Sequence, residues 1–144
     1  MSQPLSVAFI GLGAMGAPMS ARIAARFPLA VFDIDSALTA KHAASLSARA
    51  AASPGQAAEG ADVIVTMLPT SAIVAKALFA EDGAASRFKP GAVVVEMSSG
   101  VPAQTVEIAA KVAERGGRLI DAPVSGGVER AKTGELAIMV GGED

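Results

Sequence analysis

The sequence predicts a doubly wound α/β fold, in which a mainly parallel sheet is covered by helices on both faces. Short apolar runs alternate along the chain with longer segments of helical periodicity, which is the pattern of parallel strands joined by crossover helices. Several apolar runs are continuous rather than alternating, as expected of strands that are buried on both faces. The chain of 144 residues fits one domain, and 51% of its residues are hydrophobic, which is unlike a disordered chain.

Six apolar runs are the expected strands: Leu5–Ile10, Ala30–Phe32, Val63–Met67, Ala92–Val95, Arg118–Ile120 and Ala137–Val140. A helix is expected between the first two strands, because apolar residues recur there at four-residue spacing: Met15, Met19, Ile23 and Phe27. Pro28 follows the last of these and ends the helix.

Four further helices are expected over Ser36–Leu46, Ser53–Glu59, Thr70–Phe79 and Pro102–Arg115. Ser36 is the expected N-cap of the first of them, and either Thr70 or Ser71 caps the third. The last begins with a proline and ends before two glycines, which are the usual start and stop signals. A short polar segment, Val128–Lys132, is also helix-like.

Charge and composition exclude several classes of partner. The formal net charge of −2 gives no broad basic surface, so we expect no nucleic acid partner. The apolar runs are too short to span a bilayer and the N-terminus lacks a basic leader, so we expect a cytoplasmic protein with no membrane partner. There is no cysteine and no cluster of metal ligands, so no metal site is expected. The single histidine, His42, has no motif partner and is expected to pack or face solvent.

The sharpest local motif is Gly11-Leu12-Gly13-Ala14-Met15-Gly16, which follows the first expected strand and opens the first expected helix. Gly11 permits a tight turn, Gly13 lets a pyrophosphate approach the backbone, and Gly16 lets the helix pack closely on the strand. An anion then sits at the helix N-terminus, where free N–H groups and the helix dipole favour negative charge. The spacing alone also fits a simple tight turn, but its position between strand and helix favours dinucleotide binding.

An acidic residue follows at the distance that dinucleotide binding requires. Asp33 ends the second expected strand about 20 residues after Gly11, where a carboxylate can accept both hydroxyls of an adenosine ribose. This carboxylate would repel the additional phosphate of NADP, and no arginine directly follows it. We therefore expect NAD to be preferred over NADP. Asp35 is the competing residue, and it can equally begin the next helix.

A second cluster, Asp121–Gly127, follows the fifth expected strand. Gly126 and Gly127 expose successive backbone N–H groups beside the Ser125 hydroxyl, and this arrangement can hold a carboxylate or phosphate without a charged side chain. A flexible turn is the alternative that spacing alone leaves open.

Five motifs, in this order, resemble those of the β-hydroxyacid dehydrogenase family, which includes 3-hydroxyisobutyrate dehydrogenase and tartronate semialdehyde reductase. They are Phe9–Gly16, Met67–Pro69, Glu96–Gly100, Asp121–Gly127 and Gly134–Gly142. The resemblance covers nearly the whole chain. It implies a Rossmann-type NAD-binding domain, similar to that of 6-phosphogluconate dehydrogenase, of an oxidoreductase that transfers hydride between a nicotinamide cofactor and a small 3-hydroxy acid.

The resemblance also implies roles for individual residues. The positions that it assigns to the cofactor are Gly11, Leu12, Gly13, Ala14, Met15, Gly16, Asp33, Met67, Leu68, Pro69, Ser98 and Ser99, and those that it assigns to the substrate carboxylate are Ser125, Gly126 and Gly127. The glycine loop holds the pyrophosphate, and the two serines of the Glu96–Gly100 motif lie beside the nicotinamide or its ribose. Glu96 stands where the family usually has aspartate, so we expect a shifted supporting hydrogen bond.

The resemblance further implies a catalytic lysine, with a nearby asparagine, in a segment that follows the nucleotide-binding domain, and then an all-helical second domain. We expect residues 1–144 to be an incomplete dinucleotide-binding domain that lacks both and is inactive alone. Lys111 and Lys132 match no motif and are expected to be solvated. The full-length form is expected to be a homo-oligomer. A non-catalytic dinucleotide-binding module and a relative of the imine reductases are the alternatives.

Overall fold

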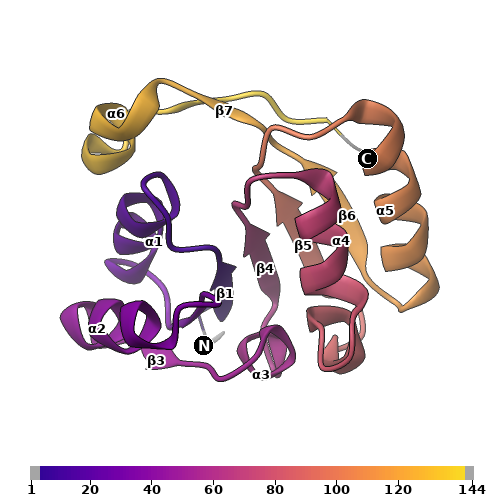
Figure 1. Ribbon diagram of the computed structural model, residues 1–144, viewed down its shortest axis with the longest axis horizontal. Helices are drawn as coiled ribbons and strands as arrows, with labels where there is room; N and C mark the ends of the chain where they lie inside the picture. The colour runs from indigo at the N-terminus through magenta and orange to yellow at the C-terminus, as the bar shows by residue number, and fades with distance from the viewer. Residues whose placement is uncertain (1–3, 142–144) are drawn as a thin grey trace.

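The main sheet has six strands: β1 (Val7–Ile10), β2 (Leu29–Phe32), β3 (Arg49–Ala50), β4 (Val63–Thr66), β5 (Val93–Glu96) and β6 (Arg118–Asp121). In this computed structural model, which describes residues 4–141, the strands lie in the order β3-β2-β1-β4-β5-β6 and all neighbours are parallel (Figure 1). The parallel, doubly wound sheet predicted from the sequence is therefore confirmed. Gly142 of the fifth motif lies outside the described residues.

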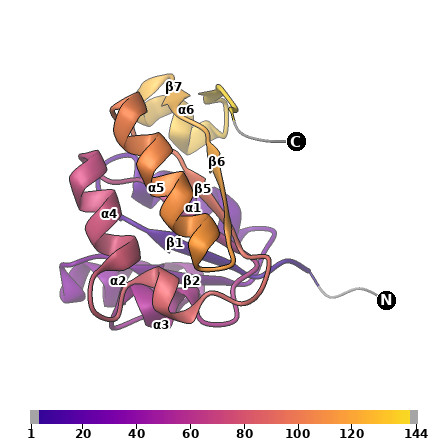
Figure 2. The same cartoon turned by 90° about the vertical axis from the view of Figure 1, so that its right-hand side faces the viewer.

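The connecting helices are α1 (Gly16–Ala24), α2 (Ser36–Leu46), α3 (Pro54–Ala58), α4 (Ser71–Phe79), the 3-10 turn η1 (Ala84–Arg87), α5 (Pro102–Glu114) and α6 (Gly127–Thr133). Helices α1 and α2 cover one face of the sheet, and α3, α4 and α5 cover the other (Figure 1). Figure 2 shows α5 lying along the edge strand β6. None of the helices within residues 4–141 is long and apolar enough to cross a membrane.

The central strand β1 shows why its apolar run is continuous. Ala8 and Ile10 point into the core beneath α3, α4 and α5, whereas Val7 and Phe9 point into the core beneath α1 and α2. All four side chains are at most 6% exposed. Because successive residues of a strand face opposite sides of the sheet, a strand with a core on each side must be apolar at every position.

The helix caps settle two choices that the sequence left open and correct one prediction. Asp35, not Ser36, is the N-cap of α2, and its side chain accepts a hydrogen bond from the backbone N–H of Leu38. The predicted cap, Ser36, is instead the first residue of the helix. The residue before it is the cap, because an N-cap side chain accepts from the N–H of the third helical residue, here Leu38. Thr70 caps α4 in the same way, which leaves the Ser71 hydroxyl available for a different contact.

The last expected strand does not join the main sheet. The strand β8 (Ala137–Ile138) is shorter than predicted and pairs antiparallel with β7 (Val124–Ser125), forming a separate two-stranded sheet. Both residues of β8 are exposed, whereas strands inside the main sheet are covered on both faces. The strand expected at Ala137–Val140 is therefore present in shortened form, but it belongs to a separate antiparallel pair rather than to the main sheet.

Helices α1 and α2 are joined by a polar contact inside an otherwise apolar interface. Ser20 of α1 is fully buried and its hydroxyl donates to the backbone oxygen of Ala17 at 3.0 Å, so it accepts from Nε2 of His42, 2.8 Å away. Burial lowers the pKa of His42 below its ordinary value, although a hydrogen bond to the Ala17 backbone opposes this. The neutral imidazole is therefore the form that the folded chain favours.

This contact predicts a pH-dependent stability. Because the pKa of His42 is lower in the folded chain than the unfolded value of about 6.5, the unfolded chain binds more protons between those two values. Stability therefore falls as the pH is lowered through this window, by at most about 1.4 kcal/mol per pH unit for one proton. His42→Gln retains an N–H donor for Ser20 but cannot take up this proton. It should therefore reduce the pH dependence of the free energy of unfolding, measured with urea between about pH 5 and pH 7. This variant has no histidine. If its free energy of unfolding still depended on pH as steeply as that of the wild type, the assignment of the pH dependence to His42 would be contradicted.

Candidate functional site

The glycine loop connects β1 to α1 and is shaped by close backbone contacts. Gly11 has φ of +108°, and a Cβ there would lie 2.1 Å from the backbone oxygen of Met67. At Gly16 a Cβ would lie 1.9 Å from the backbone oxygen of Gly11. At Gly13, by contrast, a Cβ would meet nothing within 4 Å. Two of the glycines thus fold the loop, and the third leaves its outer surface open to a ligand.

The start of α1 faces this loop and has no side-chain cap. The first N–H groups of a helix have no partner within the helix. Side chains cap α2, α3 and α4, but Met15, the N-cap residue of α1, provides no side-chain acceptor. The Ala17 N–H donates to the Gly13 backbone oxygen and Pro18 has no N–H, so an anion at the loop would bind the N–H groups that precede Ala17.

Asp33 lies at the end of β2 and is tied to the glycine loop. Its Oδ2 accepts from the backbone N–H of Leu12 at 2.8 Å, and its Oδ1 accepts from the N–H of Asp35 at 3.0 Å. The buried Thr39 of α2 holds the Asp33 backbone, because its Oγ1 accepts from the Asp33 N–H at 3.0 Å. These bonds fix the carboxylate and leave further lone pairs on both oxygens for a ligand.

A cavity of about 300 Å³ brings most of the predicted cofactor residues together. Its lining consists of Gly11, Gly13, Ala14, Met15, Gly16, Asp33, Met67, Leu68 and Pro69. It lies outside the carboxyl ends of β1, β2 and β4, where the strand order reverses between β1 and β4. This is the usual position of ligands in open α/β sheets. No lysine or arginine is among these lining residues, so a bound anion would be stabilised by backbone N–H groups alone.

Three predicted cofactor residues do not line this cavity. Leu12 is 2% exposed and points into the core, so it contributes to the site through its N–H donated to Asp33. Ser98 is 1% exposed, and its hydroxyl accepts from the Leu68 N–H at 2.8 Å. Ser99 is exposed on the loop after β5. Direct contacts of the two serines with a cofactor stay predictions.

The second predicted cluster lies above the same edge of the sheet (Figure 1). Ser125 ends β7 and is exposed, and Gly126 and Gly127 have φ of +134° and +73°, so both adopt backbone conformations that favour glycine. The helix α6 that follows them contacts α1. Ser125, Gly126 and Gly127 are thus open to solvent on the side of the sheet where the glycine loop lies.

Some supporting residues were not identified from the sequence. Thr39 and Thr66 are buried threonines that bind backbone or carboxylate groups beside the site. Thr66 is the last residue of the apolar strand β4, much as Asp33 comes directly after β2. A polar residue at the end of an apolar run was the signal that could have identified Thr66.

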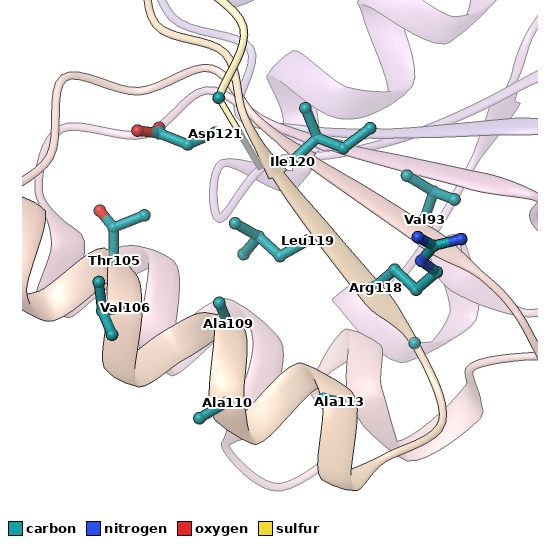
Figure 3. Close-up of a pocket in the computed structure, with 12 residues that line it drawn as sticks. Val93, Thr105, Val106, Ala109, Ala110, Ala113, Arg118, Leu119, Ile120 and Asp121 are labelled. Carbon is teal, nitrogen blue, oxygen red and sulfur yellow. The ribbon is translucent and has the colours of Figure 1, made fainter. Parts of the chain in front are cut away.

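A larger cavity, of about 760 Å³, lies elsewhere, between α5 and the edge strand β6 (Figure 3). Its walls are mostly small or apolar side chains, including Val106, Ala109, Ala110 and Ala113 of α5 and Leu119 and Ile120 of β6. It contains neither the glycine loop nor the start of a helix, so it offers no N–H cradle for a phosphate. Within residues 4–141, no group of three or more potential metal ligands converges anywhere.

Residues 6–144 match the family model described as the NAD binding domain of 6-phosphogluconate dehydrogenase. The chain belongs to this NAD-binding family. Its matched region includes the glycine loop, Asp33, the loop after β4 and the Ser125–Gly127 cluster. The Rossmann-type domain inferred from the motifs is thereby confirmed.

Individual relatives of this NAD-binding domain include two that are named as dehydrogenases. An NAD-dependent L-serine dehydrogenase of Pseudomonas aeruginosa is 44% identical over 139 residues, which are 95% of this chain and 46% of that protein. The solved 3-hydroxyisobutyrate dehydrogenase of Mycobacterium tuberculosis with L-serine has a TM-score of 0.90 at 34% identity, over 99% of this chain and 48% of the other. Psf3 in complex with NADP⁺ and 2-OPP has a TM-score of 0.87 at 30% identity, over 95% and 49%. The chain spans about half the length of the relatives that it matches.

The contrast between two glycines of the glycine loop can be tested by substitution. Gly16→Ala would force a Cβ into the backbone oxygen of Gly11, so we expect a loss of about 2–3 kcal/mol and a Tm lower by roughly 6–12 °C. Gly13→Ala meets open space and should leave the Tm within about 2 °C of the wild type. Differential scanning calorimetry of both variants measures this. Equal Tm values for the two variants would show that the loop is not packed as described.

Proposed function

We propose that this chain is the NAD-binding portion of an oxidoreductase that transfers hydride between the nicotinamide and a small 3-hydroxy acid. The observation that carries the proposal is the single cavity that combines the glycine loop, the uncapped start of α1 and the Asp33 carboxylate. When bound, NAD accepts or supplies the hydride. Two relatives support this substrate class, because one is named an L-serine dehydrogenase and the other a 3-hydroxyisobutyrate dehydrogenase.

The cofactor is proposed to cross the sheet at the reversal of strand order between β1 and β4. The start of α1 binds the pyrophosphate through N–H groups, and Gly13 lets it approach the backbone. Asp33 then binds the adenosine ribose above β2, and the loop Met67–Pro69 lies along the nicotinamide half above β4. This division follows from the strand order, because β2 and β4 flank β1 on opposite sides.

NAD is proposed to be preferred over NADP. The Asp33 carboxylate would face a 2′-phosphate at a short distance, and the cavity lining provides no lysine or arginine to offset that repulsion. One solved relative binds NADP⁺, so the preference is a property of this chain's own residues rather than of the whole family.

The substrate carboxylate is proposed to bind at Ser125, Gly126 and Gly127. The Ser125 hydroxyl and the two glycine N–H groups supply donors, and fixing the carboxylate aligns the carbinol carbon with the nicotinamide. Proton transfer from the hydroxyl is assigned to a lysine of a segment that follows this domain, as the family resemblance implies. On the basis of the same family resemblance, we also propose that the full-length form has a helical second domain and is a homo-oligomer.

The cofactor assignment is tested by titrating the chain with NAD and NADP in a calorimeter. Asp33→Asn retains the side-chain shape but removes the charge, so we expect about tenfold weaker NAD binding and a smaller preference for NAD over NADP. Asp35→Asn is the matched control, because asparagine caps a helix as well as aspartate and should leave both affinities unchanged. Equal losses in the two variants would contradict the ribose assignment, and no NAD binding by the folded wild type would contradict the proposed function.

The substrate assignment is tested in a fusion in which this chain replaces the matching part of the Pseudomonas aeruginosa enzyme. Ser125→Ala should lower kcat/KM for L-serine by about tenfold or more, because a donor to a charged group is lost. NAD affinity should not change, since Ser125 does not line the cofactor cavity. Ser86→Ala, at an exposed serine of η1, is the control. An equal kcat/KM for Ser125→Ala and wild type would exclude a role in substrate binding.

A further inference from the structure

Glu96 is a buried carboxylate at the end of β5 that binds groups from neighbouring strands. Its side chain is 1% exposed, and its Oε1 accepts from the Thr66 hydroxyl of β4 and from the Ser98 N–H, both at 2.9 Å. Its backbone oxygen accepts from the Ala122 N–H, just beyond β6, at 2.8 Å. One residue thus contacts the ends of three chain segments at the functional edge of the sheet.

The bonds of Glu96 continue into the loop that lines the cofactor cavity. The Ser98 N–H is held by Glu96, and the Ser98 hydroxyl in turn accepts from the N–H of Leu68 at 2.8 Å. Leu68 lines the cavity, whereas Ser98 and Glu96 are not among its lining residues and are each 1% exposed. The position of Leu68 is therefore set by a chain of hydrogen bonds that begins at the Glu96 carboxylate.

A second bridge joins the same two loops further from the sheet. The Ser71 hydroxyl, at the start of α4, accepts from the Val101 N–H at 3.0 Å. Between the bridges, a Cβ at Gly100 would lie 2.8 Å from that hydroxyl. The loops after β4 and β5 therefore pack as one unit, with no space for an extra methyl group between them.

We propose that Glu96 is a positioning residue that holds the loops after β4 and β5 for the nicotinamide half of the cofactor. The proposal rests on the proposed function, in which the adenosine half lies on the other side of β1. Glu96 itself touches no cofactor atom in this account. It acts through Ser98 on Leu68, and through Thr66 on the end of β4.

The energetic reason is the cost of leaving buried polar groups without partners. A buried carboxylate is tolerated only when it is hydrogen-bonded, and Glu96 is bonded to two donors through one oxygen. Without this acceptor, the Thr66 hydroxyl and the Ser98 N–H would be buried and unsatisfied, so both groups would move to reach water or another acceptor. Movement of Ser98 would release the Leu68 N–H. The loop would then have to be reordered each time the cofactor binds.

The experiment compares NAD with ADP, which contains only the adenosine and diphosphate part of the cofactor. Glu96→Met, a substitution of similar length without an acceptor, should weaken NAD binding about tenfold in calorimetric titration. It should leave ADP binding within about twofold, because Asp33 and the glycine loop are not contacted by Glu96. Ser98→Ala removes only the acceptor for Leu68 and should show the same selective loss. It serves as the second variant if Glu96→Met does not fold.

Matched threonine variants and one conservative variant separate positioning from general damage. Thr39→Val and Thr66→Val remove one buried hydroxyl each, on the adenosine and nicotinamide sides respectively. The first should weaken NAD and ADP equally, and the second should weaken NAD alone. Glu96→Gln keeps a carbonyl oxygen for both donors and should restore NAD affinity to within about threefold of wild type. Equal loss of NAD and ADP in Glu96→Met and Ser98→Ala, or no rescue by Glu96→Gln, would overturn the proposal. Failure of the folded wild type to bind NAD would instead overturn the proposed function on which it rests.

Discussion

The register of the parallel sheet is the constraint on which the rest of the structure depends. Five residues are Cα partners along one row at the carboxyl ends of the strands: Phe32, Ile10, Thr66, Glu96 and Asp121. Every strand of this row leaves the sheet at the same level, so the residues that follow meet at one edge although they are far apart in the sequence. Parallel strands make this possible, because all their carboxyl ends lie on the same side.

The two halves of this edge are stabilised differently. On the β2 side, the Asp33 carboxylate is partly exposed and holds the glycine loop through the Leu12 N–H. On the β5 side, the Glu96 carboxylate is buried and binds only groups of the protein. Both carboxylates lie within one residue of the same row, but only the exposed one retains free access for a ligand. Burial therefore decides which of the two acids is accessible to a ligand and which is bonded only within the protein.

Much of this arrangement could be predicted from the sequence because its signals are local. Continuous apolar runs identified the five longer parallel strands, and the glycine spacing located the loop whose close contacts at Gly11 and Gly16 tolerate no side chain. The two-residue strand β3 was missed, because its exposed Arg49–Ala50 leaves no apolar signal. The orientation of Ser98 was also beyond prediction, because its partner Leu68 is 30 residues away and the inward turn depends on that contact. Long-range hydrogen bonds have no sequence period, whereas the burial of a strand or helix face does.

The same reasoning explains why Asp33, rather than Asp35, is suited to select a cofactor. Two carboxylates separated by one residue look equivalent in the sequence, but one of them is committed to the N-terminus of α2, where it accepts from Leu38. The other is fixed by the Leu12 and Asp35 N–H groups, so it does not need to reorganise when a ribose arrives. An acceptor that is already oriented binds a diol more tightly than a mobile one, because less conformational entropy is lost on binding. In the proposed complex, the same fixed position would keep the carboxylate from turning away from a 2′-phosphate, so the bonds that hold Asp33 would serve both ribose binding and the proposed preference for NAD.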